Sequence, residues 1–382
     1  MNTNPEARTG KFERRVLYNG SVPSAIRRDI GQLLIGSLPG ATITPEIRSL
    51  SRDFSLGGMT VFARNIEAPE QVAELSIDAQ TLATELPLWI GVDQEGGRVA
   101  RLRKPFTEWP PMAVLGRSGN TGLASRFAAA LAAELKAVGI TLDYAPVLDI
   151  HTNPKNPVIG DRALAETADV VARLGAAIVR GLQDNGVAAC GKHFPGHGDT
   201  SVDSHLDLPL VEHPPDRIRR VECVPFREAI RADVGFIMTA HVFVPSMDEE
   251  LPATLSRRIV QDVLRDEMGY TGVILSDDLE MTAIARSYEV PEAAVKAIAA
   301  GCDAVLICSG NVEVQAATLE ALVHGVEEGR ISYKRVEDAL KRLRVAKERF
   351  LAASVAAGAP RLRHVLGCDA HQRIAEEMSR FL

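Results

Sequence analysis

The chain has 382 residues, of which 46% are hydrophobic and 24% are charged. This length and balance exclude a disordered or fibrous protein and allow a large buried core without disulfides or a structural metal. The net charge of −7 argues against general binding to nucleic acids or anionic membranes, because both need a basic face. The five cysteines are scattered and odd in number, so we interpret them as free thiols in a reducing compartment.

Residues 1–28 are predicted to form a polar N-terminal tail whose role stays open. The tail is charged and has no apolar segment of the kind found in secretory signals. No part of the chain reaches the roughly 18 consecutive apolar residues of a membrane span. We therefore expect a cytoplasmic protein that does not insert into a membrane.

After the tail, short apolar segments alternate regularly with longer segments of helical periodicity. Most of the short segments are continuous apolar runs, which is typical of parallel strands covered on both faces. Eight segments are predicted to be strands: 32–38, 58–63, 88–93, 141–148, 187–193, 235–241, 272–277 and 303–308.

Apolar residues at helical spacing predict helices between these strands. The clearest examples are residues 123–138 and 170–182. Ser256 is the predicted N-cap of a third helix over residues 260–268. The last segment, residues 361–382, is expected to be a terminal helix packed on the outside.

Eight strand–helix units in series predict an α/β protein with a (β/α)₈ barrel of the TIM type. No segment rich in proline, glycine or serine interrupts the pattern, so residues 29–382 are expected to form one barrel domain with additional C-terminal helices. A doubly wound open sheet is the structural alternative, although such sheets usually have fewer strands.

In such a barrel the active site lies at the C-terminal ends of the strands. Asp93 ends the third predicted strand, and Glu95, Arg98 and Arg101 come after it in a glycine-containing turn. The glycines allow the backbone to approach a ligand closely, but the spacing matches no phosphate-binding fingerprint. The alternative interpretation is a solvated loop held by ion pairs.

The end of the fifth predicted strand and the segment after it contain the densest group of reactive side chains in the chain. Its members include Lys192, His193, His197, Asp203 and His205. Asp203 and His205 are two positions apart, so in an extended segment they project to the same side. A carboxylate beside an imidazole fixes the tautomer of the ring and raises its basicity.

Two acidic residues, Asp277 and Asp278, end the seventh predicted strand. An acidic pair in this position is costly unless it has partners or a function. The alternative is that Asp278 caps the next helix. His241 ends the sixth predicted strand, where a structural role and a functional role are equally good interpretations.

Two kinds of chemistry are disfavoured at these strand ends. The H-x-x-x-H spacing contains Pro195 and Gly196, so it is not a helical zinc-binding pattern, and no serine lies in a G-x-S-x-G turn. We therefore expect neither a metal nor another cofactor. The remaining possibility is a carboxylate nucleophile together with a separate residue that donates and accepts protons. Enzymes of glycosyl transfer use this arrangement of catalytic groups.

Four sequence blocks at these strand ends resemble the family 3 glycoside hydrolases, specifically the bacterial β-N-acetylhexosaminidases of cell-wall (peptidoglycan) recycling. The blocks occur in the order of the family within residues 30–350. They are residues 92–99 (VDQEGGRV), 144–149 (YAPVLD), 192–198 (KHFPGHG) with 203–205 (DSH), and 276–281 (SDDLEM).

The resemblance implies a barrel enzyme that hydrolyses β-N-acetylglucosaminides with retention of configuration, the activity type EC 3.2.1.52. It makes Asp277 the nucleophile that forms a covalent intermediate, His205 the general acid/base and Asp203 the partner that orients His205. A histidine in this role departs from the usual pair of carboxylates. The resemblance also assigns binding of the terminal sugar to Asp93, Arg101, Arg162, Lys192 and His193.

The implied substrate is a small carbohydrate with terminal non-reducing N-acetylglucosamine, either an N-acetylglucosaminyl-anhydromuramyl peptide or a chitooligosaccharide. We expect a monomer. Larger family members carry a second domain with a glutamate acid/base, and the shorter length of this chain favours the single-domain type that uses histidine. Three alternatives stay open: a phosphorylase on the same fold, a metal-dependent barrel hydrolase and a sugar-binding protein without activity.

Overall fold

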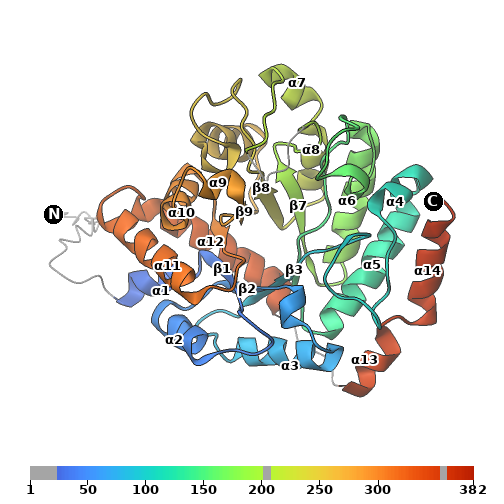
Figure 1. Ribbon diagram of the computed structural model, residues 1–382, viewed down its shortest axis with the longest axis horizontal. Coiled ribbons are helices and arrows are strands. Elements are labelled where there is room, and N and C mark those ends of the chain that lie inside the picture. The colour runs from blue at the N-terminus through green and yellow to red at the C-terminus, as the bar shows by residue number, and fades with distance from the viewer. Residues whose placement is uncertain (1–23, 201–207, 353–358) are drawn as a thin grey trace, which may run out of the picture.

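The computed structural model describes residues 24–200, 208–352 and 359–382. Eight parallel strands close into a barrel in the order β1-β10-β9-β8-β7-β6-β3-β2, and helices surround them (Figure 1). The predicted (β/α)₈ barrel is therefore confirmed. The barrel strands are β1 (Leu34–Ser37), β2 (Gly58–Val61), β3 (Trp89–Val92), β6 (Leu142–Asp143), β7 (Ala188–Phe194), β8 (Phe236–Thr239), β9 (Val273–Asp278) and β10 (Ala304–Leu306).

Each predicted strand overlaps one of these eight, but β6 is much shorter than the predicted segment 141–148. Tyr144, just after β6, still donates its main-chain N–H to the Val92 carbonyl of β3 (2.9 Å). The chain then reaches Pro146, which has no N–H to donate, so the regular strand ends there, and beyond it Val147 forms an isolated parallel bridge with Lys192 of β7. A small hairpin of β4 (Gln94–Gly96) and β5 (Val99–Ala100) follows β3.

The helices form the outer layer of the barrel, and α1 begins at Ser24, within the segment predicted as a tail. None of the helices in the described ranges is both long enough and apolar enough to span a membrane. The helices are α1 (Ser24–Gly31), α2 (Pro45–Phe54), α3 (Pro69–Gln80), α4 (Met112–Ser118), α5 (Thr121–Ala137), α6 (Ala168–Gln183), α7 (Pro215–Arg220), α8 (Val224–Arg231), α9 (Thr282–Ala285), α10 (Val290–Ala300), α11 (Val312–Glu327), α12 (Tyr333–Leu351), α13 (Ala359–Val365) and α14 (Asp369–Ser379).

The helix predicted after Ser256 is present, but it is a π-helix, η4 (Arg258–Glu267). At its end the N–H of Met268 donates to the carbonyl of Val263, five positions earlier (2.9 Å). Ser256 performs the predicted capping role, because its hydroxyl oxygen accepts from the N–H of Ile259 (3.2 Å).

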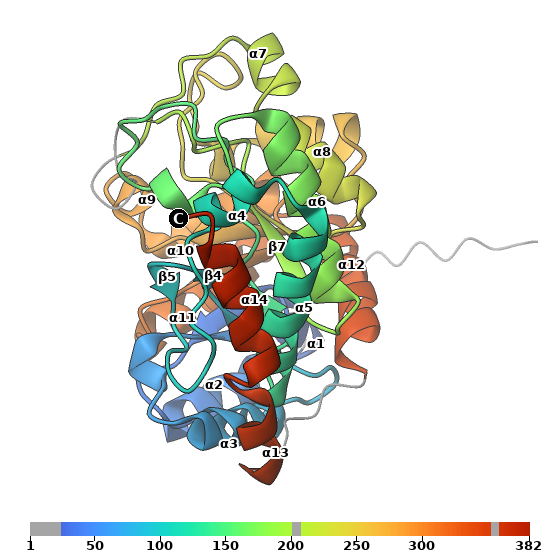
Figure 2. The same ribbon diagram turned by 90° about the vertical axis from the view of Figure 1, so that its right-hand side faces the viewer.

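The C-terminal segment 361–382, predicted as one helix, is divided between α13 and α14. Gly367 separates them with a φ of 57°, in the left-handed region that favours glycine. A Cβ at this position would lie 2.3 Å from the carbonyl oxygen of Pro105, so a side chain does not fit. The N–H of Gly367 donates to Glu134 Oε1 (2.9 Å), and α14 lies beside α5 on the outside of the barrel (Figures 1 and 2).

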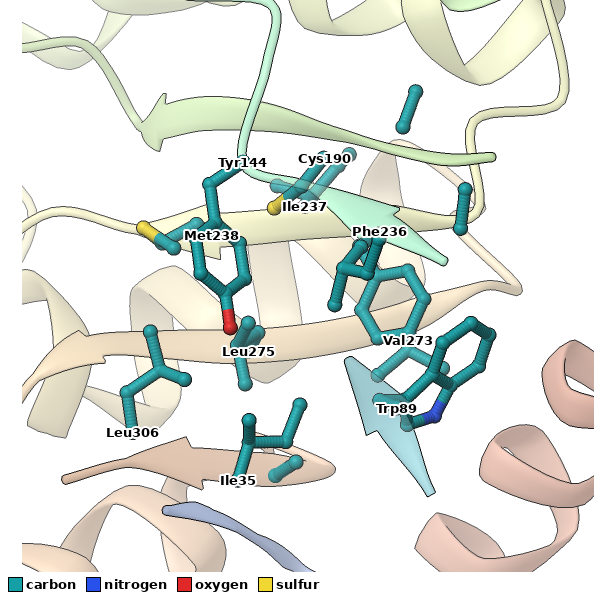
Figure 3. Close-up of a cluster of buried hydrophobic side chains, with 14 of the residues drawn as sticks. Ile35, Trp89, Tyr144, Cys190, Phe236, Ile237, Met238, Val273, Leu275 and Leu306 are labelled. Atoms are coloured by element: carbon teal, nitrogen blue, oxygen red, sulfur yellow. The ribbon is translucent and has the colours of Figure 1, made fainter. Parts of the chain in front are cut away.

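Helix α12 covers the end of the barrel at which the strands begin. Its Lys347 donates to Gln32 Oε1 just before β1 (2.8 Å), and its Phe350 packs against Gly235 just before β8. Inside the barrel, Trp89 lies toward this closed end, whereas Tyr144, Met238 and Leu306 lie toward the opposite end (Figure 3).

Candidate active site

A pocket of about 420 Å³ opens at the C-terminal ends of the barrel strands. The interior side chains Tyr144, Met238 and Leu306 form part of its lining. The barrel brings together residues that are far apart in the sequence, as the fold class predicts. Six of the eight predicted site residues line this pocket: Asp93, Arg101, Arg162, Lys192, His193 and Asp277.

The other two predicted site residues, Asp203 and His205, lie outside the described residues. His197, which precedes them in the chain, lines the pocket. The position of Asp203 and His205 relative to the pocket therefore stays a prediction.

One side of the pocket is a network of ion pairs centred on Lys192. Its Nζ lies 2.7 Å from Asp93 Oδ1 and 2.7 Å from Glu95 Oε1. Arg101 pairs with Asp93 (3.2 Å), and Arg162 donates through Nη2 and Nε to the two oxygens of Glu95 (2.8 and 2.9 Å). Burial disfavours the charged amine of Lys192, but Asp93 and Glu95 outweigh this effect and raise its pKa.

Glu95 is the member of this network to which the sequence assigned no role. Its side chain is only 2% exposed, and its pKa is lowered because Arg162 and Lys192 together outweigh the effect of burial. Glu95 is two positions after Asp93, so in an extended segment both carboxylates project to the same side. This spacing was the available signal, but the buried partner Arg162 could not be identified from it.

A second buried carboxylate, Asp149, fixes both histidines that line the pocket within the described residues. Asp149 Oδ2 lies 2.6 Å from His193 Nδ1, and Asp149 Oδ1 accepts from the main-chain N–H of His197 (2.7 Å). The carboxylate can only accept, so Nδ1 of His193 carries a proton and Nε2 is the nitrogen available to a ligand. Burial lowers the pKa of His197 to about 4, so this ring is neutral near pH 7. The sequence assigned Asp149 no role, although it ends one of the matching blocks.

Asp277 and Asp278 end β9, which is four places from β3 in the closed order of eight strands. Asp277 therefore faces the Asp93 side of the pocket from the opposite wall. Its Oδ1 accepts from the main-chain N–H of Asp278 (2.8 Å). An oriented carboxylate opposite a group of hydrogen-bond donors and acceptors can attack a sugar that the other wall holds.

Asp278 does not cap a helix, so that alternative interpretation of the sequence is wrong. Its Oδ1 accepts from the main-chain N–H groups of Glu280 (3.1 Å) and Cys308 (3.2 Å), which ties the end of β9 to the end of β10. Burial raises the pKa of Asp278 to about 7. A large fraction of Asp278 is therefore uncharged near neutral pH, which limits repulsion of Asp277.

Residues 25–346 match the model of the glycosyl hydrolase family 3 N-terminal domain. A β-hexosaminidase of Nitrosomonas eutropha is 42% identical over 287 residues, which cover 73% of this chain and 81% of that relative. A solved family 3 β-N-acetylglucosaminidase of Paenibacillus sp. is 43% identical, with a TM-score of 0.87 over 93% of this chain and 68% of that chain. NagZ of Neisseria gonorrhoeae, solved with N-trifluoroacetyl-D-glucosamine, is 32% identical, with a TM-score of 0.74 over 91% of this chain and 97% of that chain.

Proposed function

Because the chain belongs to glycosyl hydrolase family 3 and is of the β-N-acetylhexosaminidase type, we propose that it removes terminal non-reducing N-acetylglucosamine from β-glycosides with retention of configuration. The observation that carries the proposal is the position of Asp277. Its carboxylate lines the same pocket as the Lys192 network and faces it from the opposite wall.

In this proposal the network on the β3 side binds the hydroxyl groups of the sugar. Asp93 accepts hydrogen bonds from vicinal hydroxyls, and Lys192, Arg101 and Arg162 donate to hydroxyl oxygens. His193 meets the sugar through Nε2, because Nδ1 is held by Asp149. The ion pairs hold these groups in place before the sugar arrives, so little ordering remains for the binding step.

Asp277 then acts as the nucleophile in a double displacement. Its carboxylate attacks the anomeric carbon while the glycosidic C–O bond breaks, and the leaving oxygen takes a proton from His205. In the second step His205 removes a proton from water, the water oxygen bonds to the anomeric carbon, and Asp277 is released as a carboxylate. Asp203 orients His205 and stabilises its protonated form.

The resemblance to enzymes of cell-wall recycling supports muropeptides with terminal N-acetylglucosamine as the natural substrate, and the cytoplasm as the compartment. The test is a panel of 4-nitrophenyl β-glycosides that differ only at the sugar. We expect the N-acetylglucosaminide to be cleaved far faster than the glucoside, and the product to be the free sugar even in phosphate buffer. Equal rates on both glycosides would overturn the assignment, and formation of a sugar 1-phosphate would identify a phosphorylase instead.

A further inference from the structure

His241 is the second residue after β8, is 1% exposed and does not line the pocket. Its Nε2 lies 2.9 Å from the main-chain carbonyl oxygen of Asp278, and its Nδ1 lies 2.8 Å from the hydroxyl oxygen of Thr254. A carbonyl oxygen can only accept, so Nε2 must carry a proton. This contact therefore fixes the protonated nitrogen of the ring and directs it at the residue that follows Asp277.

The hydroxyl of Thr254 preserves this contact in both charge states of the imidazole. Thr254 has two acceptors within reach of its single proton, His241 Nδ1 (2.8 Å) and the carbonyl of Ala240 (2.9 Å). When the ring is neutral, the hydroxyl can donate to Nδ1. When Nδ1 is protonated, it donates to the hydroxyl oxygen, which turns its own proton to Ala240. Nε2–H remains on the Asp278 carbonyl in either case.

The hydrogen bond from His241 to Asp278 lies at the end of β9, where β8 no longer pairs with β9. The register of β8 with β9 ends at Met238 and Leu275, whereas β9 continues to Asp278. On its other side the end of β9 is held by β10, because the N–H of Leu279 donates to the carbonyl of Leu306 (3.2 Å). The imidazole of His241 thus supplies, on the β8 side, the hydrogen bond that a neighbouring strand would make.

We propose that His241 is a positioning residue for Asp277, acting through the main chain of Asp278; this rests on the function proposed above. His241 holds the carbonyl of Asp278, and the N–H of the same residue donates to Asp277 Oδ1 (2.8 Å). The same carbonyl also accepts from the N–H of Met281 in the turn that follows (3.1 Å). Without the imidazole, the Asp278 main chain keeps this local hydrogen bond and its anchors on the β10 side, but loses the hydrogen bond from the β8 side. Small rotations there would turn the Asp277 carboxylate away from the anomeric carbon, which slows its attack more than it weakens sugar binding.

The test compares three substitutions that differ in where they place an N–H group. The amide nitrogen of Gln can occupy the place of Nε2, that of Asn can reach only the place of Nδ1, and Leu has none. With 4-nitrophenyl N-acetyl-β-glucosaminide, we expect H241L and H241N to lower kcat about 10-fold to 100-fold while KM changes less than about 3-fold. H241Q should recover most of the lost kcat. T254V removes the Nδ1 partner and the hydrogen bonds of the same hydroxyl to Ala240 and Thr239, but it leaves Nε2 in place, so its loss of kcat should be smaller than that of H241L.

Thermal unfolding of each variant separates positioning from folding. If H241L does not fold, the comparison of H241Q with H241N carries the test. An H241Q variant no more active than H241N or H241L, or a loss confined to KM, would overturn the positioning role while the wild-type enzyme still cleaves the substrate. A folded wild-type protein that cleaves no N-acetylglucosaminide would overturn the proposed function itself.

Discussion

The two ends of the barrel each bury a lysine, and the two lysines meet opposite surroundings. Lys192, at the open end, has two carboxylates at 2.7 Å, which raise its pKa. Lys347, at the closed end, is 1% exposed and donates to the neutral amide of Gln32 (2.8 Å). Burial lowers the pKa of Lys347 to about 7. Burial alone therefore does not determine the charge of a lysine. The charge also depends on which groups are buried next to the amine.

The buried charges at the open end line the pocket that we propose for the sugar, whereas those at the closed end have no contact with that pocket. At the open end, the ion pairs line a pocket where a sugar can replace water around them. At the closed end, the carboxylate of Asp303 is fully buried under Arg265, Arg335 and Arg342 of η4 and α12, which holds the helix on the barrel. Lys347 lies on the same helix as Arg335 and Arg342, but among the described residues its hydrogen-bond partner is the neutral amide of Gln32, so its charge destabilises the folded state.

The largest expected effect is at the open end, at Asp277. We expect D277N to lower kcat at least about 10³-fold, because the covalent path through the carboxylate is lost. The matched control is D278N, which keeps an oxygen that can accept from Glu280 and Cys308. It should lose less than about 10-fold, since Asp278 is already partly uncharged near pH 7. Steady-state kinetics and circular dichroism of both variants test this, and the reverse order would mean that the nucleophile is Asp278.

The next largest effect concerns His205, whose two proton transfers can be separated by the leaving group. With a sugar aglycone, H205A should lose about 10²-fold to 10⁴-fold in the first step, because the departing alkoxide needs a proton. With a 2,4-dinitrophenyl aglycone, that step should be much less impaired. We then expect a burst of dinitrophenolate, followed by slow steady release that is limited by hydrolysis of the glycosyl–enzyme.

Azide needs no base to attack the glycosyl–enzyme, so it should raise the slow steady rate of H205A and yield a β-glycosyl azide. D203A should show a milder form of the same behaviour. If H205A is equally impaired for every leaving group and azide has no effect, His205 is not the acid/base.

A third prediction compares the contributions of Lys192 and Lys347 to the free energy of unfolding. K192M should lower the free energy of unfolding by about 3 kcal/mol, because Asp93 and Glu95 lose a buried partner and keep only their arginines. K347M should raise the free energy of unfolding by at least about 1 kcal/mol at pH 7, because a buried amine that has no carboxylate partner in the described part of the chain is replaced by an apolar group of similar length. Urea unfolding of both variants measures this. Equal destabilisation by the two substitutions would contradict the conclusion that the partners of a buried lysine decide its effect on stability.

The smallest expected effect is the pH dependence that Lys347 contributes. Its pKa is about 7 in the folded protein and near its ordinary value of 10.5 in the unfolded chain. Between these values the unfolded chain binds a proton that the folded protein does not, so stability rises with pH by about 1.4 kcal/mol per unit. Urea unfolding of wild type and K347M at pH 7.5 and 9.0 isolates this slope, since the other groups contribute to both. Parallel pH profiles would show that Lys347 stays charged in the fold.

Much of the fold and part of the site could be predicted from local sequence patterns. Each strand buried on both faces is a short apolar run, and closure of eight such runs places their ends around one pocket. Asp93 and Asp277 could be identified for this reason, because each ends a run. The exceptions in the fold were local backbone effects, such as the early end of β6 before Pro146 and the break at Gly367.

Glu95 and Asp149 could not be assigned roles because their partners are remote in the sequence. Glu95 meets Arg162 across 67 positions, and Asp149 meets His193 across 44. A charged residue in a loop has the same appearance in the sequence whether it is solvated or buried against a partner. Only the closed barrel distinguishes the two cases.

The sequence by itself determined the barrel, the strand ends that carry chemistry and the resemblance to a glycosidase family, because these depend on periodicity and local motifs. Only the tertiary structure decided the charge of each buried group. Lys192 meets Asp93 across 99 positions, and Lys347 meets Gln32 across 315. The free energy of a buried charge depends on the partners within a few ångströms, and the closed barrel determines which residues become those partners. Two lysines that are the same residue type in the sequence therefore become an ion-paired cation at the open end and, at the closed end, an amine whose pKa is lowered to about 7, so that it is only partly charged near neutral pH.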